Sequence, residues 1–162
     1  MKKLFTLSFL FLAMVYSSNG LGQMLENNKD RVRWYIEECV NKRKLDLVDN
    51  IFADSFRVHS LPDCSQRVST KNDLKDFLNT LFEGFPDIHY IIGDIIGEGN
   101  KVAMRVSLRA TQEKEFLGIP SKRKKINYIS EVLFFRFENG RIAEDWVQLD
   151  LYNLFKKMKG LP

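Results

Sequence analysis

The sequence predicts an α+β fold in which three helices in the first half cover one face of a curved, mainly antiparallel sheet made by the second half. Two observations carry this prediction. Apolar residues recur at helical spacing up to about residue 85, and beyond Phe85-Pro86-Asp87 they follow the shorter period of strands. Turn residues separate the strand-like segments, and Asn139-Gly140 is the strongest signal because both central residues of a type I′ turn need positive φ. Helices followed by such a meander can bury one sheet face and enclose a pocket.

The first 22 residues have the features of a secretory signal peptide, which leaves residues 23–162 as a single domain. Lys2 and Lys3 precede an apolar run over residues 4–15, and small and polar residues follow it. The run is shorter than the roughly 20 apolar residues that cross a bilayer, so a transmembrane helix is the weaker alternative. We therefore expect a secreted or periplasmic protein.

Charge and cysteine content bound the function further. The chain holds 25 basic and 21 acidic residues, and removal of Lys2 and Lys3 lowers the net charge from +4 to +2. This small excess gives no basis for nucleic-acid binding. Export would place Cys39 and Cys64 in an oxidising compartment, but two cysteines do not make a disulfide framework, and their pairing stays open.

Three helical patterns precede the sheet. The first follows Asn27-Asn28, which can cap a helix, and the second is a short pattern over residues 45–52. The third begins at a capping box formed by Thr70 and Asp73. The apolar face of the first helix consists of Val32, Tyr35, Ile36, Cys39 and Val40, and that of the third consists of Leu74, Phe77, Leu78, Leu81 and Phe82.

Four strands are predicted over residues 88–96, 101–112, 125–137 and 141–150. The second strand alternates clearly, with one apolar face that includes Val106 and Leu108. The third strand is apolar on both faces, so it is central in the sheet or contacts a second copy of the chain, which makes a homodimer through the sheet one expectation. The tail over residues 151–162 reads as a short amphipathic turn or helix.

Several segments in this order carry a family resemblance. They are Phe85-Pro-Asp87, Gly97-Glu-Gly-Asn-Lys-Val-Ala103, Glu115-Phe-Leu-Gly-Ile-Pro120 and Arg136-Phe-Glu-Asn-Gly-Arg-Ile142, followed by Glu144, Trp146 and Asp150. Together they resemble the SnoaL-like polyketide cyclase family, from about the first helix to Leu154. The resemblance implies a nuclear-transport-factor-two-like fold, an α+β cone with an apolar pocket between helices and sheet. Its best-understood members close a ring by an aldol reaction without metal or cofactor, so the resemblance implies neither here.

The resemblance also places the ring-closing groups of the family on this chain. An Asp of the cyclases stands immediately after the position of Trp146, where this chain has Val147. Two histidines of the family fall at Leu133 and Gln112. Since valine and leucine cannot move protons, the resemblance implies a pocket that is kept while its chemistry is altered or absent.

Other polar residues can supply a replacement acid or base. Strand alternation puts Asp145 on the face of Val147 and Glu131 on the face of Leu133, where apolar walls would raise the pKa of either carboxyl. Alternatively, both lie at the wet end of the sheet and pair with Arg or Lys. His59 follows the second helix, where family members carry a histidine facing the pocket mouth, although a lone histidine is often structural. The two histidines have no carboxylates at metal-ligand spacing, so no metal site is predicted.

The sequence therefore supports three functions of different kinds. The first is binding of a small lipophilic molecule in a pocket lined by Leu108, Gln112, Glu131, Leu133, Phe135 and Val147. The second is a cofactor-independent ester cyclase or isomerase that uses Asp145 and His59 as acid and base. The third is a structural dimerisation module. The basic loop over residues 122–125 is either solvated or drawn to an anionic lipid surface.

Overall fold

The structure is a computed structural model that describes residues 22–59, 68 and 70–160. The predicted signal peptide, apart from residue 22, and Cys64 lie outside the described residues. Within the described part of the chain, no helix combines the length and the apolar character needed to cross a membrane. Localisation and cleavage stay predictions, and the pairing of Cys39 with Cys64 stays open.

The predicted helices are present, and the predicted start of the first is wrong. Residues 22–34 are helical and continue into η1 (Tyr35–Val40), so the helix does not start at Asn27-Asn28. A short second helix consists of η2 (Leu45–Leu47) and α2 (Val48–Ile51), and α3 (Lys71–Gly84) is the third. The capping box of α3 is confirmed: the Thr70 side chain accepts from the Asp73 N–H, and the Asp73 side chain accepts from the Thr70 N–H. The tail forms α4 (Leu151–Lys159), capped by the Asp150 side chain.

In the described part of the chain, five strands form one sheet in the order β1-β5-β4-β3-β2. They are β1 (Phe52–His59), β2 (His89–Glu98), β3 (Lys101–Thr111), β4 (Lys125–Glu138) and β5 (Arg141–Leu149). The four predicted strands pair in antiparallel fashion, and the turn between β4 and β5 has positive φ at both Asn139 and Gly140, as predicted. Sequence analysis missed β1, which adds parallel to β5. Its first residue, Phe52, was assigned to the second helix, which in fact ends at Ile51.

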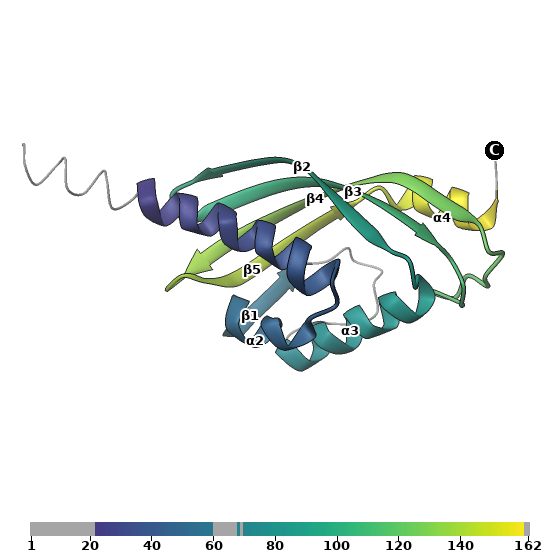
Figure 1. The fold of residues 1–162 in the computed structure, drawn as a ribbon, viewed down its shortest axis with the longest axis horizontal. Coiled ribbons are helices and arrows are strands. Elements are labelled where there is room, and N and C mark those ends of the chain that lie inside the picture. Colours follow the sequence, from purple (N-terminus) through teal and green to yellow (C-terminus); the bar gives the residue numbers. More distant parts are fainter. Residues whose placement is uncertain (1–21, 60–67, 69, 161–162) are drawn as a thin grey trace, which may run out of the picture.

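The helices of the first half and the sheet form two layers. Figure 1 shows the N-terminal helix, α2 and α3 on one side of the bent sheet, with α4 at the end where β4 begins. Strand β4 is central, as predicted, and from Ile129 to Phe137 buried and outward-facing residues alternate: Glu131, Leu133 and Phe135 are buried on the inner face. Val132 and Phe134, on the outer face, are 40% and 38% exposed. A homodimer through the sheet would cover these exposed apolar side chains, and it stays a prediction.

A single π-helical turn at the end of the first helix packs this helix against β2. The Asn41 N–H donates to the Ile36 carbonyl at 2.8 Å, the five-residue spacing of a π-turn. The Asn41 side chain then donates to the Tyr90 carbonyl at 2.9 Å and accepts from the Tyr90 N–H at 2.8 Å. Two bonds from one side chain fix the end of the helix against the sheet, and so bring Tyr35 and Tyr90 to the same interior space.

Candidate functional site

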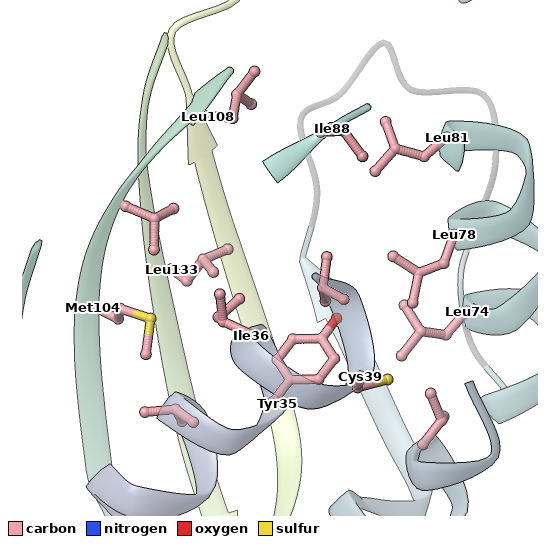
Figure 2. Close-up of a cluster of buried hydrophobic side chains, with 14 of the residues drawn as sticks. Tyr35, Ile36, Cys39, Leu74, Leu78, Leu81, Ile88, Met104, Leu108 and Leu133 are labelled. Atoms are coloured by element: carbon pink, nitrogen blue, oxygen red, sulfur yellow. The ribbon is translucent and has the colours of Figure 1, made fainter. Parts of the chain in front are cut away.

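A cavity of about 400 Å³ lies between the helices and the inner face of the sheet. Its walls come from η1, α3, the start of α4 and strands β1 to β5, together with the segment over residues 115–117. Figure 2 shows Leu74, Leu78 and Leu81 of α3 facing Leu108 and Leu133 of the sheet, with the Tyr35 ring between them. The volume is in the range that holds a small organic ligand, and the walls are mostly apolar.

Six of the described lining residues carry polar side chains, namely Tyr35, Thr80, Tyr90, Glu115, Glu131 and Asp145. Two of them, Glu131 and Asp145, are carboxyl groups that are almost completely buried, at 7% and 5% exposure. No lysine, arginine or histidine is among the described lining residues. The cavity therefore holds two buried acids without a compensating cation in its described wall.

Burial shifts the protonation of both acids. It raises the pKa of Glu131 to about 7, although a hydrogen bond from the Tyr90 side chain works in the opposite direction. It raises the pKa of Asp145 to about 8, and the charge of nearby Glu131 adds to the shift. Near neutral pH both acids therefore exist in protonated and ionised forms, and Asp145, with the higher pKa, is the more protonated of the two. One member can then donate a proton while the other accepts one.

Each acid also has an oxygen without a protein partner. Glu131 Oε2 and Asp145 Oδ1 are buried and accept no hydrogen bond from any described residue. An unmet buried acceptor costs on the order of 1–3 kcal/mol, so these two atoms are ready to accept a hydrogen bond from a bound molecule.

Two tyrosines complete the polar cluster. Burial and the nearby acids, Glu131 for Tyr90 and chiefly Asp145 for Tyr35, keep the pKa of both hydroxyls well above its ordinary value. Both therefore remain protonated and can act as hydrogen-bond donors. Sequence analysis missed Tyr90 and assigned Tyr35 only to an apolar helix face. The available signal was the polar hydroxyl of each tyrosine on an otherwise apolar segment. This signal does not reveal that the helix of Tyr35 and the strand of Tyr90 meet in the fold.

Four of the six residues predicted to line the pocket are at the cavity, namely Leu108, Glu131, Leu133 and Val147. Leu133 and Val147 are directly paired across β4 and β5, so the two positions that the family resemblance assigned to a His and an Asp do lie together on the inner face. The acids of this chain stand two residues away on the same strands, at Glu131 and Asp145.

The other two predicted residues lie elsewhere in the interior. Gln112 is fully buried, and its amide donates to the carbonyls of Lys114 and Ile119 at 3.1 and 2.8 Å, which holds the loop before β4. Phe135 is also fully buried and packs edge-on against Tyr35 with ring centres 6.3 Å apart. Neither is among the residues that line the cavity.

His59 lies on the opposite face of the sheet from the cavity. Strand β1 pairs with β5 so that Val58, opposite Asp145, lines the cavity, while His59, opposite Trp146, points outward. The His59 ring stacks on Trp146 at 4.5 Å, and its Nε2 lies 3.2 Å from Glu144 Oε2. The structure thus separates the predicted pair of Asp145 and His59 and places Asp145 in the same cavity as Glu131 instead.

The remaining candidate groups do not extend the site. Burial raises the pKa of the Cys39 thiol to about 12, which leaves it protonated and unreactive at neutral pH. Within the described chain, no three His, Cys, Asp or Glu side chains gather as metal ligands.

Comparison with known proteins gives the family. Residues 29–158 match the model of the SnoaL-like polyketide cyclase family. The chain belongs to this family. None of the curated proteins is a significant sequence match to it.

Solved structures agree with the fold. A protein from Jannaschia sp. CCS1 assigned as a SnoaL-like polyketide cyclase superimposes with a TM-score of 0.77 at 22% identity, over 86% of this chain and 96% of that one. TsrD from Streptomyces laurentii gives 0.74 at 18% identity, over 84% and 97% of the two chains. A SnoaL-like polyketide cyclase from Agrobacterium tumefaciens gives 0.65 at 19% identity, over 80% and 95%. At these identities the likeness establishes the α+β fold alone.

Proposed function

We propose that this protein binds a small, neutral, lipophilic molecule in the cavity and transfers a proton on it without a cofactor, with Asp145 as the base. The observation that carries the proposal is the Glu131–Asp145 pair, two buried acids with raised pKa inside an apolar cavity. Ionisable groups kept in such surroundings reduce stability, and they are typical of acid–base sites.

The described wall also limits the ligand. With no cation among its described residues, this wall offers nothing to balance a carboxylate or phosphate. An anion would also be repelled by the charge that the acid pair carries near neutral pH. A neutral carbonyl compound fits both the apolar walls and the donors of the cluster.

Each group has a distinct role in the proposed step. In the fraction of molecules in which Asp145 is ionised, its carboxylate takes a proton from the carbon beside the carbonyl, which leaves an enolate. The Tyr35 hydroxyl, in the same cavity, donates to the enolate oxygen. Glu131 accepts a hydrogen bond from the Tyr90 hydroxyl, and its charge helps to raise the pKa of Asp145 toward the value that a base needs near neutral pH. This enolisation is the first step that a cyclase or an isomerase of this family type needs.

Deuterium exchange tests the proposal without knowledge of the natural substrate. The probe is 1-tetralone, a neutral bicyclic ketone, and the readout is exchange at the carbon beside its carbonyl in heavy water, followed by NMR. The wild type is expected to exceed Asp145→Asn on the order of 100-fold, the lower end of what a general base contributes. His59→Ala is the matched control and should exchange like the wild type. Equal rates for wild type and Asp145→Asn would overturn the role of Asp145.

A binding function without catalysis is the second candidate. It is favoured by Val147 and Leu133, which occupy the cavity at the positions that the resemblance assigns to the family's proton-transfer groups. Calorimetric binding of 1-tetralone, unchanged in Asp145→Asn and accompanied by no exchange above buffer, would select this function.

A further inference from the structure

One end of the molecule carries the excess of positive charge in the chain. We call the segments 113–128 and 150–160 together the basic end. They contain eight Lys and Arg residues and three acidic residues, a net charge of +5, while the rest of the chain has 17 basic and 18 acidic residues. The net charge of +4 is therefore not spread over the surface but comes from this end.

The two segments are in direct contact. The Lys122 ammonium donates to the Lys159 carbonyl at 3.0 Å, and the Lys157 ammonium donates to the Asn127 carbonyl. Figure 1 shows α4 at the same end of the molecule as the start of β4. Arg123 pairs with Glu113 at 3.2 Å, but Lys124, Lys156 and Lys159 form no ion pair with any described acid. Several cations thus remain available to an external anion.

Exposed apolar side chains stand among these cations. Leu117 is 47% exposed, and Tyr128 and Tyr152 are each 76% exposed. Tyrosine side chains placed between water and hydrocarbon are typical of membrane–water interfaces, and basic residues beside them are attracted to anionic headgroups.

The cavity reaches the surface at the same end. Its lining includes Glu115, Phe116 and Leu117 from one segment of the basic end, and Leu151 and Leu154 from the other. Of the described lining residues, only Thr80, Glu115 and Leu117 are exposed, and two of these three belong to the basic end.

We propose that the basic end is a docking surface for an anionic phospholipid membrane, which brings the mouth of the cavity to the lipid. Charge complementarity supplies the attraction, and Leu117, Tyr128 and Tyr152 enter the headgroup region. The proposal goes beyond the function of the cavity, and its membrane step does not depend on what the cavity binds. A lipophilic ligand would then pass between bilayer and cavity without crossing water.

Cosedimentation with lipid vesicles tests the docking surface. All described elements lie within residues 22–160, so the measurement uses the chain from residue 22, free of the apolar run over residues 4–15. Vesicles of phosphatidylcholine alone are compared with vesicles containing roughly one-third phosphatidylglycerol, at low salt and at about 0.5 M salt. The expected result is binding only to the anionic vesicles, and its loss at high salt.

Two triple variants, each with three positive charges fewer than the wild type, distinguish binding through the basic end from nonspecific electrostatic attraction. The first variant combines Lys122→Gln, Arg123→Asn and Lys124→Gln. It is expected to weaken binding to anionic vesicles at least tenfold, since each cation near such a surface contributes about 1 kcal/mol. Asn suits position 123 because its φ is +50°. The second variant is the control and combines Lys42→Gln, Lys101→Gln and Arg141→Gln. The three original side chains are exposed and lie outside the basic end, so the control is expected to bind within about twofold of the wild type.

Three results would overturn the proposal. They are binding that does not depend on phosphatidylglycerol, an equal loss in both triple variants, and tighter binding to a short DNA duplex than to anionic vesicles at matched salt. Circular dichroism checks that each variant is folded. Asp145→Asn should bind vesicles like the wild type, so failure at the membrane and failure of the proposed chemistry are distinguishable.

Discussion

The two faces of β5 carry neighbouring carboxylates in opposite surroundings. On the outer face, Glu144 accepts from Arg136 at 2.7 Å and lies beside His59, and these contacts lower its pKa. On the inner face, the next residue, Asp145, meets an apolar wall and a second acid, and its pKa rises to about 8. One residue along a strand reverses the environment, because successive side chains point to opposite faces of the sheet.

The two faces differ in their effect on the stability of the fold. The outer cluster links β1, β4 and β5 through satisfied charges, so it serves the fold. The inner pair leaves acceptors unmet, which costs stability and provides a site where a ligand can bind. Substitutions on the two faces should therefore have effects of opposite sign.

The largest effect is expected for Asp145→Asn in alkaline solution. A folded pKa raised above the unfolded value means that ionisation opposes folding, so the wild type loses stability as pH rises from about 4 to about 8. The amide cannot ionise, so the variant is expected to gain roughly 2–4 kcal/mol over the wild type between pH 5 and pH 9. Urea unfolding at both pH values measures this gain. Parallel pH profiles of wild type and variant would show that Asp145 ionises normally.

Glu144→Gln should act in the reverse direction and more weakly. Its lowered pKa stabilises the folded state above the unfolded pKa of a glutamate, and this contribution disappears as pH falls through the folded pKa. The variant is expected to be less stable than the wild type at pH 7 and to approach it only as the pH falls well below 4, as measured by thermal unfolding. A larger loss in acid than at neutral pH would contradict the ion-pair account.

The smallest effect is expected for His59→Ala. The ring is exposed and stacks on Trp146 outside the cavity, so its removal should change the fluorescence of Trp146 while 1-tetralone affinity and exchange stay the same. Double substitution with Trp146→Phe controls for the source of the signal. A loss of exchange in His59→Ala would mean that the histidine reaches the cavity after all.

Local pattern was sufficient for much of the architecture. The capping box of Thr70 and Asp73, the turn at Asn139-Gly140 and the alternation of β3 predicted elements that the structure contains, because these signals depend on neighbours in the chain. Strand β1 was missed because it directly follows the second helix and pairs with β5, nearly 90 residues away, so nothing beside it in the sequence identifies its partner.

The candidate site was predictable in part for the same reason. Alternation alone put Glu131 with Leu133 and Asp145 with Val147. Only tertiary structure decided that these faces lie under the helices, that Tyr35 and Tyr90 join them, and that His59 points away. A strand's sequence specifies which side chains share a face, but the packing of distant helices decides which face loses water, and the loss of water raises the pKa of the two acids.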